Sequence, residues 1–191
     1  MLYVNQLKYR DIPYQHNMGN GGVPEDRRNV ATSGCGLCCA CMVVDGLTDK
    51  KLEIVDCVRL SEENGANLDV GTDMTVLGPI IAEKFGLTYS RTESLEEAIA
   101  HLQRGGMIIS HVGHPEGQAG LFTMRGHYIT LISTDGKEFC ILDPSYKEGK
   151  FDIPERVGKV NDDNAPYLYC DVNILHGETK GSRYHLFLRK K

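Results

Sequence analysis

Three segments in the first half of the chain have apolar residues at helical spacing: Cys35 to Val44, Thr72 to Phe85 and Ser94 to Gln103. The first is almost entirely small and apolar, which predicts a helix buried on most sides. The second is followed by Gly86, a plausible C-cap. In the third, Ser94 and Glu97 have the spacing of a capping box at the start of a helix.

After Gly105 and Gly106 the pattern changes to short alternating or apolar runs, which predict β-strands. These runs are Met107 to Val112, Tyr128 to Thr134, Glu138 to Leu142, Asp171 to His176 and Tyr184 to Leu188. Helices followed by a mostly antiparallel sheet indicate an α+β fold. We expect one domain over 1–191, with a helical part at about 1–105 and a sheet part at about 106–191.

Charge and hydropathy mainly limit the classes of partner that the protein is expected to bind. The formal net charge is -5, and no basic stripe offers a footprint for phosphates, so nucleic acid is not expected as a partner. Positions 16 to 34 are rich in glycine, asparagine, proline and charge, which predicts a loop. No apolar run reaches the roughly 18 residues that span a bilayer, so no membrane association is expected.

The N-terminus, from Met1 to Gln6, lacks the basic and apolar regions of a signal peptide. The sequence therefore predicts a cytoplasmic protein, although removal of a leader before Met1 would give the same start. Seven cysteines are present, an odd number, and four of them lie within seven positions. This arrangement does not resemble a disulfide framework and favours reduced thiols.

The candidate nucleophile is Cys35, which lies between Gly34 and Gly36 at the start of the first predicted helix. Backbone amides and the helix dipole stabilise a thiolate at such a position, and the thiolate is the reactive form of cysteine. The flanking glycines allow another backbone or a substrate to approach closely. The alternative is a small buried cysteine within a cysteine-rich helix.

His127 opens the second predicted strand, and Asp143 follows the third. A three-residue hairpin loop of 134–136, with Gly136 in the left-handed conformation, would pair Ser133 with Lys137 and place His127 opposite Asp143. A two-residue turn would instead put the two side chains on opposite faces. The longer loop predicts a carboxylate beside an imidazole, as a general base and its orienting group require.

A metal site competes for the cysteine cluster of Cys35, Cys38, Cys39 and Cys41. A structural zinc site usually needs a second pair of cysteines at set spacing, and none is present, so no metal or other cofactor is expected. Cys38, Cys39 and Cys41 are better explained as small core residues. His111 and His114 lack a carboxylate placed to complete a site, which favours a surface position or the rim of a cleft.

Four short motifs occur in a fixed order: Pro13-Tyr14-Gln15, Ala31-Thr32-Ser33-Gly34-Cys35-Gly36, Gly126-His127-Tyr128 and Leu142-Asp143-Pro144. Together they resemble the bacterial peptidase family numbered thirty-nine of the papain-like superfamily, whose best-known members remove double-glycine leaders from bacteriocins. The resemblance covers about Ile12 to Tyr146. Relatives often have Pro-Thr-Ser after the Gly-Cys-Gly, whereas this chain has Leu37-Cys38-Cys39, which puts the subfamily in doubt.

The resemblance implies a papain-like fold in which Cys35 is the nucleophile, His127 the base and Asp143 the group that orients it. It also implies that Gln15 donates to the oxyanion, beside the backbone amide of Cys35. An extended peptide would lie in a cleft between the helical and sheet parts. Gly34, Gly36 and Gly126 are the candidate residues that line it.

The function expected from these residues is hydrolysis of a peptide or isopeptide bond in a peptide or protein substrate, through a thioester acyl-enzyme. The same three groups also serve amidases and acyl transferases, because the thioester can be passed to water or to an amine. A second class is a papain-like binding module with an idle site, since the scaffold alone does not decide function.

Overall fold

The computed structural model describes residues 1–14, 28–68, 71–113 and 119–190. The helices are η1 (Gln6–Lys8), α1 (Val30–Ser33), α2 (Cys35–Leu47), α3 (Ile54–Glu63), α4 (Met74–Phe85), α5 (Leu95–Gln103) and α6 (Val172–Glu178). The strands are β1 (Asn67–Leu68), β2 (Gly71–Thr72), β3 (Leu87–Thr92), β4 (Met107–Gly113), β5 (Gly126–Thr134), β6 (Glu138–Leu142), β7 (Val160–Asn161), β8 (Tyr167–Asp171) and β9 (Thr179–Arg189). The fold is α+β, as predicted.

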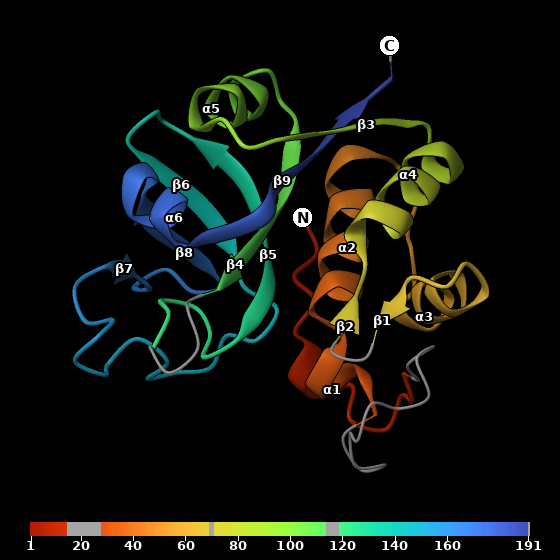
Figure 1. The fold of residues 1–191 in the computed structure, drawn as a ribbon, viewed down its shortest axis with the longest axis horizontal. Coiled ribbons are helices and arrows are strands. Elements are labelled where there is room, and N and C mark those ends of the chain that lie inside the picture. The colour runs from red at the N-terminus through yellow and green to blue at the C-terminus, as the bar shows by residue number, and fades with distance from the viewer. Residues whose placement is uncertain (15–27, 69–70, 114–118, 191) are drawn as a thin grey trace.

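A seven-stranded antiparallel sheet forms the centre of the molecule, with the strand order β3-β9-β4-β5-β6-β8-β7 (Figure 1). A two-stranded ribbon of β1 and β2 lies among the helices. The large sheet includes β3, which comes from the half of the chain predicted to be helical. Its neighbour β9 comes from the C-terminal end, so the middle of the chain pairs with its C-terminal end at one edge of the sheet.

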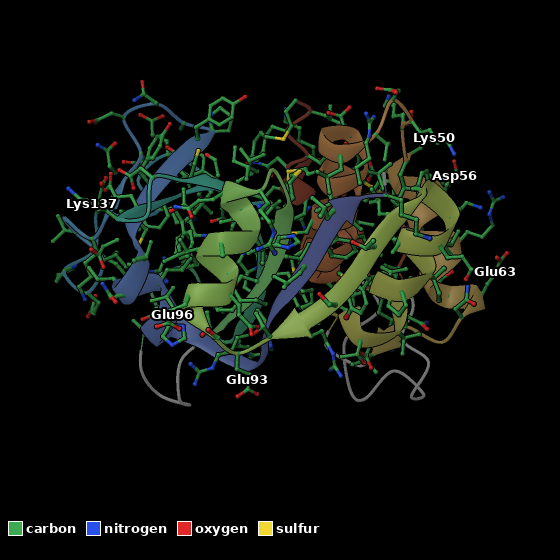
Figure 2. All side chains as sticks on the ribbon, turned by 90° about the horizontal axis from the view of Figure 1, so that it is seen from above. Lys50, Asp56, Glu63, Glu93, Glu96 and Lys137 are labelled. Carbon is green, nitrogen blue, oxygen red and sulfur yellow. The ribbon has the colours of Figure 1, made fainter. Side chains whose placement is uncertain are left out.

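The sheet is buried on both faces, and alternate residues of β4 enter different cores. Met107 and Ile109 join α2, α3 and α4 in one cluster of buried apolar side chains. Ile108 and Val112 join α5 and α6 in a second cluster. This alternation follows from the pleat of a strand, in which successive side chains point to opposite faces. Charged side chains labelled in Figure 2, such as Lys50, lie at the periphery.

The predicted central helix is confirmed as α2. From Gly36 to Val44 every residue is buried, so the helix has no solvent-facing stripe over this stretch. Small side chains such as Cys38 and Ala40 allow it to pack between α3 and the strands β4 and β5. Thr48 ends the helix by donating from its hydroxyl to the Val44 carbonyl oxygen at 2.6 Å.

The two other predicted helices are also confirmed. Helix α4 begins two residues later than expected, because Asp73 is its N-cap and accepts from the Thr75 amide at 2.8 Å. Gly86 ends this helix in the left-handed conformation, with φ +71°. Helix α5 is capped by Ser94, whose hydroxyl accepts from the Glu97 amide at 3.2 Å.

Two predictions about the extent of secondary-structure elements are wrong. The segment from Asp171 to His176 is not a strand, since α6 begins at Val172 after the end of β8. Asp171 caps this helix by accepting from the amides of Asn173 and Ile174. The loop expected over 16–34 ends earlier than predicted, because α1 occupies Val30–Ser33 behind an Asn29 cap; residues 16–27 lie outside the described residues.

No helix within the described ranges is both long and apolar enough to cross a bilayer.

Candidate active site

Cys35 is the first residue of α2, directly after Gly34. It is partly exposed, whereas the other six cysteines are buried. A thiol at this position lies at the positive end of the helix, where unpaired backbone amides favour a negative charge. This is the environment predicted from the sequence, and it separates Cys35 from every other cysteine in the chain.

The flanking glycines are required by packing. A Cβ on Gly36 would lie 2.9 Å from Thr72 Cβ and 3.3 Å from Tyr128 Cδ2. A Cβ on Gly34 would lie 2.5 Å from Val30 Cγ1, where α1 turns into α2. Both glycines are buried. The absent side chain of Gly36 lets the start of α2 approach β5, and that of Gly34 lets α1 turn into α2. The predicted contact of both glycines with a substrate stays a prediction.

His127 and Asp143 lie side by side, as the hairpin argument predicted. Their Nε2 and Oδ1 atoms are 2.8 Å apart, and Asp143 has no solvent-exposed area. Gly136 has the expected positive φ, at +91°. Since Nε2 is engaged by the carboxylate, the remaining ring nitrogen, Nδ1, is the one available to a thiol.

The register that produces this contact differs from the predicted one. Near the turn Thr134 pairs with Phe139, which by itself would place His127 and Asp143 on opposite faces of the hairpin. A bulge between Leu131 and Ser133 shifts the register by one residue, and Thr130 then pairs with Leu142. This shift restores the shared face that the simple loop was expected to provide.

The ionisation of Cys35 and His127 is coupled. Burial opposes ionisation of the thiol, but the hydrogen bond and charge of His127, with the backbone amides of Tyr128 and Gly36, lower the pKa of Cys35 below its usual value. Burial would lower the pKa of His127, but Asp143 and then Cys35 raise it to about 9. Both shifts run in the direction that favours a thiolate beside an imidazolium.

Asp143 is an ionised carboxylate despite its burial. Burial by itself would raise its pKa, but His127 and Lys150 hold the pKa well below its usual range. Its Oδ1 also accepts from the backbone amide of Ser145 at 2.8 Å and from the Ser145 hydroxyl at 3.0 Å. The carboxylate is thus fixed by four donor groups.

Two of these donor residues, Ser145 and Lys150, were missed from sequence. The Ser145 hydroxyl lies 3.1 Å from His127 Nε2. Lys150 forms an ion pair with Asp143 Oδ2 from within the long segment between β6 and β7. The Asp143-Pro144-Ser145 sequence carries a turn signal that could have suggested Ser145. Lys150 has no comparable signal, because its place depends on how the whole segment folds.

The remaining candidates have mixed outcomes. Gly126 is exposed at the start of β5, and a Cβ there would lie 3.0 Å from His111 Nε2. His111 stacks on Tyr128, with ring centroids 4.8 Å apart. Gln15 and His114 lie outside the described residues. Tyr14, next to Gln15 in the chain, is fully buried, and its hydroxyl contacts the side chains of Ser61 and Thr72.

Three of the four cysteines of the metal alternative are buried in the core, and only Cys35 is partly exposed. Within the described ranges, no group of three or more histidine, cysteine, aspartate or glutamate side chains is placed to hold a metal ion. Cys38, Cys39 and Cys41 are each buried among apolar side chains of the first core cluster. Burial raises the pKa of Cys38 and of Cys39 well above the usual thiol value.

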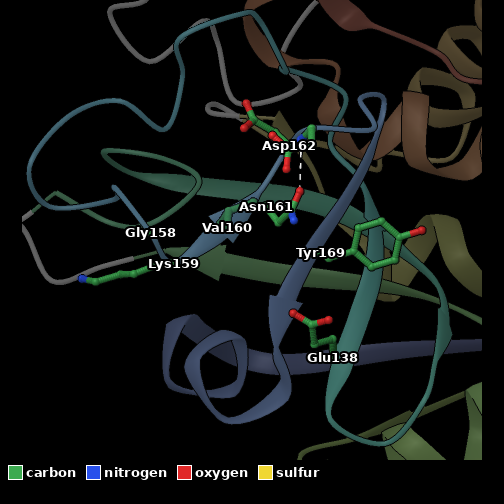
Figure 3. Close-up of a pocket in the computed structure, with 8 residues that line it drawn as sticks. Glu138, Gly158, Lys159, Val160, Asn161, Asp162 and Tyr169 are labelled. Carbon is green, nitrogen blue, oxygen red and sulfur yellow. Dashed lines mark hydrogen bonds between the residues drawn. The ribbon is translucent and has the colours of Figure 1, made fainter.

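An open polar depression of about 310 Å³ lies elsewhere on the molecule (Figure 3). It is lined by Glu138, Gly158, Lys159, Val160, Asn161, Asp162, Asp163 and Tyr169. These residues belong to β6, β7, β8 and the segments beside them, at one end of the sheet. None of the candidate site residues lines this depression.

Two solved structures with a similar fold are described as peptidases. The peptidase domain of Streptococcus ComA, described as a bifunctional ABC transporter involved in a quorum-sensing pathway, aligns with a TM-score of 0.54 and 15% identity, over 82% of this chain and 91% of that domain. A protein from Bacillus anthracis described as a C39-like peptidase aligns with a TM-score of 0.56 and 15% identity, over 100% of this chain and 95% of that one.

This chain has the fold of a C39 peptidase domain. The resemblance to peptidase family thirty-nine is confirmed at the level of the fold. No protein-family model matches the sequence, and no curated protein sequence matches it significantly. At 15% identity the C39 fold does not by itself assign a role to any residue.

Proposed function

We propose that this protein is a cysteine peptidase that hydrolyses a peptide or isopeptide bond through a thioester acyl-enzyme. The observation that carries the proposal is the arrangement at the N-terminus of α2, where Cys35 begins the helix and its pKa is lowered by His127, whose Nε2 lies 2.8 Å from Asp143 Oδ1. The fold shared with C39 peptidases supports the same reading. No metal or organic cofactor is required by this chemistry.

In the proposed mechanism the Cys35 thiolate attacks the carbonyl carbon of the scissile bond. The carbonyl oxygen becomes an oxyanion, for which the backbone amide of Cys35 and the side chain of Gln15 are the proposed donors. Protonated His127 gives its proton to the leaving nitrogen, the C–N bond breaks, and an amine leaves behind a thioester on Cys35.

Neutral His127 then accepts a proton from water, and the resulting hydroxide attacks the thioester carbonyl. The C–S bond breaks, the acid product leaves, and the thiolate and imidazolium are restored. Asp143 keeps Nε2 of His127 engaged throughout, so that Nδ1 faces the sulfur and the substrate. The substrate itself is proposed only as a peptide or protein segment.

The first test is the pH dependence of Cys35 alkylation by iodoacetamide, with the modified site identified by mass spectrometry. Cys35 is the one partly exposed cysteine, so faster labelling than the buried six would follow from access alone. The decisive measurement is the acid limb of the profile, which is the pH range in which labelling slows because the Cys35 thiolate becomes protonated. It should lie well below that of free cysteine in the wild type, and should return toward the free-cysteine value in His127→Ala.

His176→Ala is the matched control. His176 belongs to α6, on the side of the sheet away from α2, and its Nδ1 lies 3.0 Å from the Tyr184 hydroxyl (Figure 1). This variant should retain the low acid limb. A wild-type profile that matches free cysteine would reject an activated thiolate.

Turnover is tested by incubating the protein with a mixed peptide library and identifying new termini by mass spectrometry. The wild type should generate new termini and Cys35→Ala should not. A low acid limb without any cleavage would favour the binding-module alternative.

A further inference from the structure

Lys150 is a buried lysine next to the proposed catalytic groups. It is 8% exposed, and its ammonium group contacts Asp143 Oδ2 and the Ser145 hydroxyl oxygen, the latter at 2.7 Å. A buried lysine is costly unless it is paired, so its position requires an explanation. The proposed mechanism above does not use it.

The segment around Lys150 holds the side chain in place. The Arg156 guanidinium, itself buried, donates from Nη1 to the Lys150 carbonyl oxygen at 3.1 Å and from Nε to the Gly120 carbonyl oxygen at 2.9 Å. Gly149, with φ +73°, allows the chain to turn immediately before Lys150. These contacts indicate a built position for the ammonium group and not a surface lysine folded inward by chance.

The carboxylate of Asp143 is divided between two cationic partners. Oδ1 faces His127 Nε2, and Oδ2 faces the Lys150 ammonium group. Both partners also contact one atom, the Ser145 hydroxyl oxygen, at 3.1 Å for His127 and 2.7 Å for Lys150. The positive charge of Lys150 therefore lies close to the imidazole, and it cannot be screened by bulk water at this depth.

We propose that Lys150 is a positioning residue whose ammonium charge sets the pH range in which Cys35 and His127 exist as thiolate and imidazolium. The inference rests on the proposed function, since it concerns the same pair of groups. Lys150 acts in two ways: it holds Oδ2 so that Oδ1 stays on His127, and it adds a positive charge beside the pair.

The direction of the charge effect follows from electrostatics. A nearby positive charge favours the Cys35 thiolate and disfavours the His127 imidazolium, so it lowers the pKa of both groups. Burial lowers the pKa of Lys150 overall, while Asp143 and, more weakly, the charge of Cys35 act to raise it, so Cys35 and Lys150 influence each other's ionisation. The pair would thus form and lose its proton at lower pH than with Asp143 alone.

Other ionisable groups around the pair are fixed contributors to the same field. They include Tyr3, whose hydroxyl donates to the Asp143 carbonyl oxygen, Tyr14, Tyr128, Arg156, and Cys38 and Cys39 of α2. None of them contacts the Asp143 carboxylate as Lys150 does, so substitution at 150 should isolate the effect of the second cation.

The test compares Lys150→Gln with Lys150→Arg and the wild type in the pH profile of Cys35 alkylation by iodoacetamide. The glutamine amide can still donate to Asp143 but has no charge, whereas arginine keeps the charge. We expect the acid limb to move upward by about one pH unit in Lys150→Gln and to stay near the wild-type value in Lys150→Arg. NMR titration of His127 in the same variants should move in the same direction.

An unchanged or lowered acid limb in folded Lys150→Gln overturns the inference. This outcome differs from failure of the proposed function, in which the wild-type acid limb would already match free cysteine. A purely structural role is also distinguishable, because it would release Asp143 and lower the pKa of His127 instead of raising it.

If Lys150→Gln does not fold, the wild-type protein still decides the question. Methyl methanethiosulfonate converts the Cys35 thiolate to a neutral mixed disulfide, releasing methanesulfinate. Because coupling is reciprocal, blocking the thiolate should lower the pKa of Lys150, measured from its side-chain carbon shifts by NMR. An unchanged Lys150 titration after complete blocking would overturn the inference.

Discussion

The first turn of α2 and the turns that follow it place cysteines in opposite environments. Cys35 and Cys38 are three residues apart on one helix, yet burial raises the pKa of Cys38 well above the usual thiol value, whereas His127 and two backbone amides lower that of Cys35 against its burial. Cys38 has no exposed area. The residue type and the helix are the same, so the neighbours decide the chemistry.

The difference shows that separate parts of one helix have separate roles in packing and in the candidate site. The later turns of α2 serve packing, and small thiols fill narrow space between α3 and the sheet. The first turn serves the site, because Gly36 lets it approach the start of β5, where His127 lies. A reactive cysteine arises where the helix end meets the sheet.

The largest expected effect comes from replacing the cysteine sulfur by oxygen, once in the first turn of α2 and once in the next turn. Cys35→Ser should reduce peptide cleavage by at least about 1000-fold, because a serine hydroxyl is not ionised by His127 at neutral pH. Its stability should change little, since the residue is partly exposed. Cys38→Ser should do the reverse and lower the free energy of unfolding by about 1–3 kcal/mol, because it buries a hydroxyl in an apolar site.

Cleavage by the mixed-library assay and urea unfolding followed by circular dichroism measure the two effects. Equal losses of activity in the two variants would show that the contrast between the regions is not functional.

The next largest effect concerns the carboxylate of Asp143, which contacts His127 beside the first turn of α2. Asp143→Asn leaves Lys150 buried without its counter-ion, so the free energy of unfolding at neutral pH should fall by about 3–5 kcal/mol. The folded-state pKa of Asp143 lies below the unfolded value of 3.8. The stabilisation is therefore present above pH 3.8 and is lost as the pH falls below it.

The difference between wild type and Asp143→Asn should accordingly shrink as the pH is lowered below 3.8, as measured by urea unfolding at a series of pH values. Asp152→Asn, an exposed site in the same segment, should follow the wild type throughout. A difference that stays constant into acid would mean that the carboxylate charge is not what stabilises this region.

Local sequence signals predicted the elements that depend on local contacts. Capping by Ser94 and Gly86 and the apolar run from Cys35 gave three helices that the structure contains. The same kind of signal was misread at Asp171, whose side chain caps a helix where alternation had suggested a strand. The edge strand β3 was missed because, apart from Leu87, its residues are not buried and carry no strong pattern.

The candidate site was predictable where it depends on face and order along the chain, and unpredictable where it depends on long-range packing. His127 and Asp143 share a face as expected, but only because a bulge between Leu131 and Ser133 corrects the register set by the turn. No residue in that stretch gives a sequence signal that predicts the bulge. Lys150 reaches Asp143 because Arg156 and the turn at Gly149 fold its segment inward, which no local pattern encodes.

The smallest expected effect tests why the first turn of α2 can approach the sheet at all. Gly36→Ala places a Cβ 2.9 Å from Thr72 Cβ and 3.3 Å from Tyr128 Cδ2, and both neighbours are held in the fold. The start of the helix must therefore move away from β5, at a cost of about 1–3 kcal/mol in the free energy of unfolding. The Tyr128 amide would then support the Cys35 thiolate less well, so alkylation at pH 6 should slow a few-fold.

Gly46→Ala is the control from the other end of the same helix. A Cβ there meets the sulfur ends of Met107 and Met1, which are flexible and can move aside, so Cys35 alkylation should be unchanged. If both alanine variants slow alkylation equally, the effect belongs to the helix as a whole. If only Gly36→Ala does so, the reactivity of Cys35 depends on how closely the first turn of α2 approaches Tyr128. The contrast between Cys35 and the buried cysteines of the later turns would then depend on the position of this turn to within a few tenths of an ångström.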